Sequence, residues 1–270
     1  MMDAHIRTLL EKLAEEGRLN DAREQDRSKK MLNLEPETAQ LLSILVRSSK
    51  CTRLLEIGTS NGYSTIWLAW ASHLVGGRVI SIDRNERKHV LADANLRQIG
   101  LRESVDLISG DATKIIADLP GPFDFVFFDA DRRSAPSQLS VLVPKLAPEV
   151  FILADNALSH PDEIAEYLAV INTLPDFEHI IIPVGKGLSI AYRGAPHQSS
   201  QIFDQPERWG CKGLASPFSL TSRLRKHLRR LACVLCGGWH VDGRSPSTCQ
   251  PPHKTGGRSG ALLRAVTPGS

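Results

Sequence analysis

Five oxygen-bearing side chains follow directly on apolar segments of this 270-residue sequence. Asp83 ends one segment, Asp129 and Asp131 follow a second, and Asp155 and Asn156 follow a third. If these segments are parallel strands of one sheet, their carboxyl ends meet at the edge where α/β sheets bind ligands. Aspartate and asparagine also favour strand ends and helix caps for structural reasons alone. That explanation is weaker for five positions at one edge than for a single one, so we expect a ligand site there.

A glycine-containing loop, LLEIGTSNGYST at residues 54–65, precedes these acids. Gly58 and Gly62 allow a tight turn and a close approach of the backbone to a ligand. The pattern E-x-G-x-x-x-G is neither the G-x-G-x-x-G of dinucleotide binders nor the P-loop pattern. Asp83 lies 25 residues after Gly58, where an acid can accept both hydroxyls of a ribose. An ordinary strand-to-helix turn is the alternative, and it is less favoured once Asp83 and the GDA at 110–112 are included.

The elements that must position these residues alternate between apolar runs and helical patterns. Apolar spacing predicts a helix over residues 3–16, and Pro36 suits the first turn of a second helix. Strands alternating with helices predict a parallel sheet that is covered on both faces. We expect its strands at 53–57, 78–83, 105–109, 123–130 and 150–155, with an antiparallel pair at 179–184 and 188–193 closing one edge.

Six blocks of the sequence together resemble a known enzyme family. The blocks are EIGTSNGYST, SIDRN, SGDA, FDFVFFDAD, LADN and PVGKGLSIA, in this order, within residues 30–193. They resemble the small cation-dependent O-methyltransferases that use S-adenosylmethionine, which include catechol and caffeoyl-coenzyme A O-methyltransferases and many bacterial relatives. The resemblance implies an α/β fold of the Rossmann-like class I methyltransferase type. Its sheet has seven mostly parallel strands with an antiparallel last strand, and helices lie on both faces.

The resemblance also implies roles for individual residues. The segment MLNLEPETAQ resembles the part of the family that closes over the cofactor. The metal ligands correspond to Asp129, Asp155 and Asn156. The candidate catalytic residues are Asp129 and Arg132, which stands where the family often has a lysine. The cofactor-binding positions correspond to Glu56, Gly58, Thr59, Gly62, Ser64, Asp83 for the ribose, Asp111 and Ala112 on the adenine side, and Asp131.

The implied chemistry is methyl transfer to an acidified hydroxyl. Two carboxylates and an amide oxygen suit Mg²⁺ or another hard divalent cation better than zinc. Adjacent hydroxyls of a small, catechol-like acceptor could occupy two of the remaining positions on the cation. Such a cation lowers the pKa of the hydroxyl and holds the resulting oxyanion.

Arg132 departs from the family pattern. A lysine that can act as a general base often stands three residues after the first metal aspartate, whereas this sequence reads DADRR. Arginine stays protonated, so Arg132 is a poor base. Either the cation alone acidifies the hydroxyl and Arg132 stabilises the oxyanion, or the activity is altered; Arg132 and Arg133 could also simply face solvent. His160 could serve as a base, but SHPDE also reads as an ordinary helix start, which we favour.

Charge and composition divide the chain at residue 194. Residues 195–270 hold 11 Lys/Arg and 3 Asp/Glu, about +8, whereas the remainder holds 22 and 27, about −5. We expect a methyltransferase domain at 1–194, with N-terminal helices at 1–48 and a sheet core at 52–193. The basic tail, rich in proline, glycine and serine, is predicted to be disordered. A basic helix in this tail could contact nucleic acid, acidic lipid or a partner protein, and the zinc pattern of CVLC, His240, Cys249 and His253 is weak.

No run approaches the length of a membrane span and no signal core precedes the first helix, so we expect a cytoplasmic protein. The family resemblance adds the expectation of a homodimer. One alternative is a nucleotide-dependent oxidoreductase, against which the glycine spacing argues. The other is a catalytically altered S-adenosylmethionine-binding protein whose basic tail binds nucleic acid or a partner. Nucleic acid is otherwise not expected as a ligand.

Overall fold

A computed structural model of the chain describes residues 2–195. The basic tail predicted from residue 195 onward, with its candidate helix and its weak zinc pattern, lies outside the described residues apart from its first position.

Seven strands of the described part form one sheet in the order β3-β2-β1-β4-β5-β7-β6. Strands β1 to β5 pair in parallel with one another, and β7 is antiparallel to both β5 and β6. The predicted fold class is therefore confirmed, including the antiparallel last strand. The strands are β1 (Arg53–Ile57), β2 (Arg78–Asp83), β3 (Val105–Ser109), β4 (Phe123–Phe128), β5 (Leu146–Ala154), β6 (Glu178–Ile182) and β7 (Leu188–Arg193).

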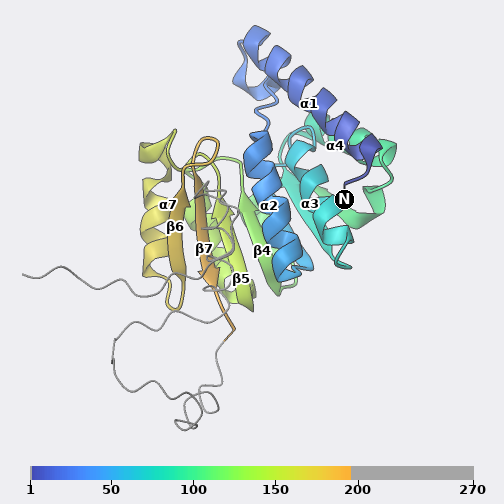
Figure 1. The fold of residues 1–270 in the computed structure, drawn as a ribbon. Helices are drawn as coiled ribbons and strands as arrows, with labels where there is room; N and C mark the ends of the chain where they lie inside the picture. The colour runs from blue at the N-terminus through green and yellow to red at the C-terminus, as the bar shows by residue number, and fades with distance from the viewer. Residues whose placement is uncertain (1, 196–270) are drawn as a thin grey trace, which may run out of the picture. The chain divides into compact units, whose positions relative to one another are not determined.

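Helices cover both faces of this sheet, as Figure 1 shows. Alternate residues of the strands point to opposite faces, so Leu54 packs on one face and Leu55 on the other. The first face packs against α1 (Ala4–Arg23), α2 (Pro36–Ser49), α3 (Tyr63–His73) and α4 (Glu86–Gln98). The second face packs against α5 (Ala112–Asp118), α6 (Ala135–Leu142) and α7 (Pro161–Thr173).

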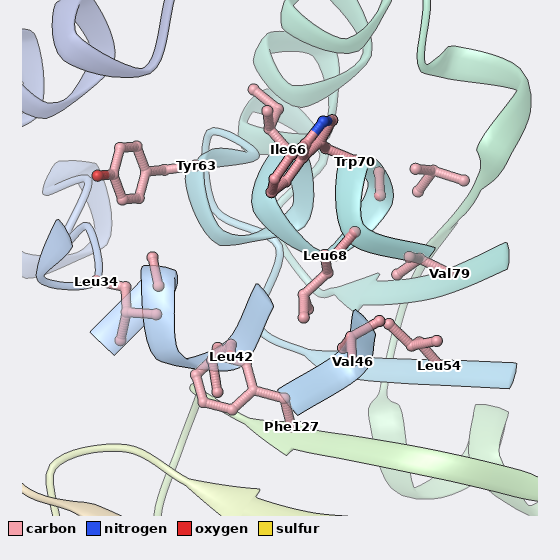
Figure 2. Packing of buried hydrophobic residues seen from close by; sticks show 14 of the residues in the cluster. Leu34, Leu42, Val46, Leu54, Tyr63, Ile66, Leu68, Trp70, Val79 and Phe127 are labelled. Carbon is pink, nitrogen blue, oxygen red and sulfur yellow. The ribbon is translucent and has the colours of Figure 1, made fainter. Parts of the chain in front are cut away.

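The core on the first face connects α2 and α3 to the sheet. Leu42 and Val46 of α2 lie beside Leu54 of β1 and Phe127 of β4, all at most 1% exposed (Figure 2). Burial of this apolar surface fixes the layers, and so fixes where the strands end.

The first helix is longer than predicted: it runs to Arg23 rather than to residue 16. Its later turns lack the apolar spacing that marked its start, so the sequence pattern ended too early. A polar side chain in these turns binds the segment between α1 and α2 instead. The Asp21 carboxylate accepts hydrogen bonds from the backbone N–H groups of Met31 (2.7 Å) and Leu32 (2.8 Å). This contact brings the segment before α2 back toward the sheet.

None of the helices in residues 2–195 combines the length and the apolar character that crossing a membrane requires.

Candidate active site

The glycine loop leaves β1 directly against the start of the segment that follows β4. The Gly58 N–H donates to the Ile82 carbonyl (2.8 Å), and the Asp129 N–H donates to the Ile57 carbonyl (2.8 Å). Gly58 has φ +114°, and a Cβ atom there would overlap the backbone carbonyl of Asp129. A side chain does not fit at this position. The close contact between the loop and Asp129 therefore requires glycine at residue 58.

Glu56 stabilises the glycine loop from its buried side. Its side chain is fully buried and accepts hydrogen bonds from the hydroxyls of Ser64 (2.6 Å), Thr65 (2.5 Å) and Ser81 (2.6 Å). Burial raises the pKa of Glu56 to about 7, and the three hydroxyl donors limit that rise. The carboxylate therefore ties β1 to α3 and β2 and does not reach the open edge of the sheet.

Glu56 gives the fold a testable pH dependence. Because its pKa is about 7 in the folded protein and 4.5 in an unfolded chain, the unfolded chain releases the proton first as the pH rises. This contribution to stability therefore falls between these two values. Glu56→Gln removes this pH-dependent loss of stability. Between pH 5 and pH 8 we therefore expect the free energy of unfolding of the variant to increase by about 2 kcal/mol relative to that of wild type.

Urea unfolding at several pH values measures this difference. Glu178→Gln, a change at an exposed glutamate at the start of β6, is the matched control and should keep the wild-type pH profile. A Glu56→Gln profile parallel to that of wild type would contradict the assignment.

Two further loop residues also have side chains that face inward. The Thr59 hydroxyl is hydrogen-bonded to Ser81 Oγ (2.6 Å) and lies 3.3 Å from His89 Nε2. Ser64, at 5% exposure, is bonded to Glu56. Of the predicted cofactor residues, Glu56, Thr59 and Ser64 thus build the loop from its inner side.

Asp83 connects the second strand to the glycine loop. Its carboxylate accepts from the backbone N–H groups of Ser60 (2.8 Å) and Asn85 (2.9 Å). The Gly110 N–H donates to the Asp83 carbonyl (3.0 Å), which places the next predicted pair beside it. In that pair Asp111 is exposed and caps α5 by accepting from the Lys114 N–H, and Ala112 begins the helix. Asp83, Asp111 and Ala112 therefore lie along one stretch of the carboxyl edge.

The predicted metal ligands lie together at the ends of β4 and β5, and we call Asp129, Asp155 and Asn156 the acid rim. All three line one small pocket, together with Arg132. The Asp155 N–H donates to the Phe128 carbonyl (3.0 Å), which fixes the two strand ends in register.

Asp155 is 3% exposed, and its two carboxylate oxygens differ. Oδ2 accepts a hydrogen bond from the Asn156 side chain (2.6 Å), whereas Oδ1 is buried without a partner. Burial, followed by the charge of Glu35, raises the pKa of Asp155 to about 6. Burial and the charge of Asp155 likewise raise the pKa of Asp129 well above its usual range.

These properties fit a divalent cation. A buried carboxylate oxygen without a donor, next to a second carboxylate, leaves negative charge that a cation would neutralise. The described residues contain no cluster of three His, Cys, Asp or Glu side chains placed to hold a metal ion. Asn156 adds an amide oxygen beside the two carboxylates, and its backbone has φ +65°, a conformation that asparagine tolerates better than most residues. Its amide would have to turn its oxygen toward the cation, because Oδ1 now accepts from Ser159 Oγ (3.1 Å).

Asp131 and Arg132 lie beside the acid rim with different environments. Asp131 is exposed, and its carboxylate accepts from Ser134 Oγ (2.6 Å) and the Arg133 N–H (3.2 Å). The Arg132 side chain is only 11% exposed, and its Nε and Nη2 donate to Glu163 Oε2 at 2.9 and 2.6 Å. Arg132 therefore does not face solvent, unlike Arg133, and its charge is paired with a residue of α7.

His160 occupies the N-cap position of α7, followed by Pro161 in the first turn. Its Nδ1 lies 2.9 Å from Ser159 Oγ. This agrees with the helix-start interpretation of SHPDE.

Sequence reasoning missed two charged residues near the acid rim, Glu35 and Lys186. Lys186 Nζ lies 2.7 Å from Glu35 Oε1. Both residues stand inside segments that the family resemblance had marked, MLNLEPETAQ and PVGKGLSIA. The sequence showed no link between them because they are far apart in the chain.

The order of the strands, with one antiparallel strand inserted next to the edge, defines a class I S-adenosylmethionine methyltransferase fold. An O-methyltransferase from Bacillus cereus, solved in complex with SAH, matches 69% of this chain and 91% of its own, with 24% identity and a TM-score of 0.58. The O-methyltransferase TomG from Streptomyces achromogenes, involved in tomaymycin synthesis and solved with SAM, is 25% identical, with a TM-score of 0.58 over 72% of this chain and 92% of its own.

The model of the O-methyltransferase family matches residues 7–193, and the chain belongs to this family. Among curated relatives, a catechol O-methyltransferase from Niastella koreensis is 30% identical over 131 residues, which are 47% of this chain and 59% of that protein. The chain thus spans about three fifths of the length of the curated relative that it matches.

Proposed function

We propose that this protein is an S-adenosylmethionine-dependent O-methyltransferase that requires a divalent cation and acts on a small, catechol-like hydroxylated molecule. The observation that carries the proposal is the buried, unpartnered Oδ1 of Asp155 beside Asp129, at the edge that also carries the glycine loop. Family membership supports methyl transfer, and the name of the curated relative supports a catechol-like acceptor.

In this proposal the loop and the neighbouring strand ends hold the cofactor. The backbone at Gly58 and Gly62 approaches it closely, and Asp83 accepts hydrogen bonds from its ribose hydroxyls. Glu56, Thr59 and Ser64 keep the loop in shape from the inner side. Asp111 and Ala112 flank the adenine, and Asp131 lies near the cofactor or the acceptor.

The acid rim would hold Mg²⁺ or a similar cation through Asp129, Asp155 and the oxygen of Asn156. Such a cation lowers the pKa of a bound hydroxyl and leaves part of its coordination shell open for the acceptor. Arg132, held in place by Glu163, would stabilise negative charge on the acceptor oxygen rather than take up its proton.

The other parts of the proposal concern the organisation of the protein. We propose a methyltransferase domain at residues 1–194, and the family match, which ends at residue 193, supports this boundary. A homodimer is also part of the proposal and is supported by the family resemblance alone.

Calorimetry with S-adenosylmethionine tests the proposed function. One titration contains Mg²⁺ and a catechol, and a second contains EDTA in place of Mg²⁺. We expect saturable cofactor binding in both, and formation of a methylated catechol only with Mg²⁺. Turnover that persists in EDTA would contradict the cation requirement, and absence of cofactor binding would contradict the methyltransferase assignment.

A further inference from the structure

We propose that Glu35 and Lys186 form a charge-setting pair beside the acid rim: the ammonium of Lys186 cancels the charge of Glu35, so that the rim presents two negative charges and selects a divalent cation. This inference rests on the proposed function, since it concerns the same cation site.

Lys186 is anchored by its backbone to the residues that directly follow the acid rim. Its carbonyl accepts hydrogen bonds from the N–H groups of Leu158 (3.1 Å) and Ser159 (3.1 Å). The next carbonyl, of Gly187, accepts from the Ala157 N–H (2.9 Å). The turn between β6 and β7 therefore lies directly against the chain that leaves Asp155 and Asn156.

Glu35 reaches this turn from the other side. It is the residue before α2, and its Oε1 lies 2.7 Å from Lys186 Nζ. Its other oxygen, Oε2, is buried without a hydrogen-bond partner. A Cβ atom at Gly185, which has φ +55°, would lie 2.8 Å from Glu35 Oε2 and 2.5 Å from Thr38 Oγ1. A side chain at position 185 would displace these two side-chain oxygens, and the positive φ also favours glycine there.

The pair acts on both acids of the rim. The charge of Glu35 raises the pKa of Asp155 and that of Asp129, whereas the charge of Lys186 lowers both. Burial remains the larger influence on each acid. The backbone hydrogen bonds from Leu158 and Ser159 to Lys186, two and three residues after Asn156, place the pair next to the acid rim, where its charges change the free energy of a bound cation.

The ion pairs near the acid rim determine which charges there have no partner. Arg132 is paired with Glu163, and Lys186 is paired with Glu35. The carboxylates of Asp129 and Asp155 remain without a paired cation among the described residues. With a cation bound, both carboxylates would be ionised, and their two negative charges would match the charge of one divalent cation.

Calorimetric titration with Mn²⁺ tests the pair in four proteins: wild type, Glu35→Gln, Lys186→Met and the double variant. Glu35→Gln leaves an unpaired ammonium, and we expect the dissociation constant for Mn²⁺ to rise about tenfold. Lys186→Met leaves a third carboxylate, and we expect the constant to fall about tenfold. In the double variant both charges are gone, so we expect a value close to that of wild type.

The matched controls are Lys12→Met and Glu16→Gln, which break an exposed ion pair on α1. Neither should change the affinity for Mn²⁺, and thermal melting without metal shows whether each variant is folded. Opposite changes in the two single variants, with recovery in the double variant, support the proposal. A purely structural role of the pair predicts that both single variants bind more weakly, and that result would overturn it, as would unchanged affinities.

The outcomes separate this inference from the proposed function. If wild type binds Mn²⁺ and the variants bind it equally well, the charge-setting role fails while the cation site stands. If only Lys186→Met binds Mn²⁺, the ammonium itself acts as the resident positive charge, and the cation requirement fails. If none of the four proteins binds Mn²⁺, both the pair's role and the cation requirement are overturned.

Discussion

Replacing Asp155 with asparagine is expected to abolish the stabilisation of the protein by Mg²⁺ and to lower methyl transfer about 100-fold or more. Asn keeps the size of the side chain and can keep one contact with Asn156, but it removes the charge on the buried Oδ1. A cation at the acid rim would then meet one carboxylate instead of two. Turnover of a catechol with S-adenosylmethionine, and melting with and without Mg²⁺, measure the two effects.

The metal-free variant distinguishes loss of the site from loss of the fold. Since burial raises the pKa of Asp155 to about 6, the ionised group opposes folding at pH 8, and the neutral amide does not. We therefore expect Asp155→Asn to melt at the wild-type temperature or above it when no metal is present. Asp162→Asn, a change at an exposed residue in the first turn of α7, is the control and should leave activity unchanged. Full activity of Asp155→Asn would remove Asp155 from the cation site.

Gly58→Ala is expected to weaken S-adenosylmethionine binding by more than about tenfold and to destabilise the fold by about 3 kcal/mol. Two effects combine at this position. The φ of +114° is unfavourable for alanine, and the added methyl group would overlap the carbonyl of Asp129. Relief requires the loop to move away from the end of β4, where the proposed cofactor site adjoins the acid rim.

Gly76→Ala isolates the first of these effects. Gly76 also has a positive φ, +76°, but no atom lies within 4 Å of an added Cβ. We expect a cost of about 1 kcal/mol and unchanged cofactor affinity. Equal losses in the two variants, measured by urea unfolding and by calorimetry, would show that backbone strain alone matters at Gly58.

Sequence reasoning succeeded where a local pattern determines the structure. Apolar runs such as FDFVFF predicted buried strands, and the acids that follow them ended at one edge because the strands are parallel. It stopped short where polar residues continue an element, as in the last turns of α1. The inward orientation of Glu56 was also hidden, since an acid beside a glycine loop gives no sign of the face it occupies.

Ion pairs between residues that are far apart in the sequence could not be predicted. From the sequence, Arg132 was interpreted as a solvent-facing or a catalytic residue. Its ion pair with Glu163 was not predicted because the two residues are 31 positions apart. The contact between Glu35 and Lys186 depends on how the segment before α2 folds back toward the sheet. Such contacts are set by packing of the layers and by the glycine at position 185 rather than by local spacing.

The place of β7 between β5 and β6 also has a consequence for synthesis on the ribosome. The strand that ends at Asp155 pairs on one side with β7, from Val150 opposite Arg193 to Ala154 opposite Ser189. Until residues 189–193 leave the exit tunnel, one edge of β5 is unpaired and can pair with other chains. At about 5–20 residues per second this exposure lasts for seconds. A chain that is cut short before β7 would therefore be prone to aggregation rather than merely inactive.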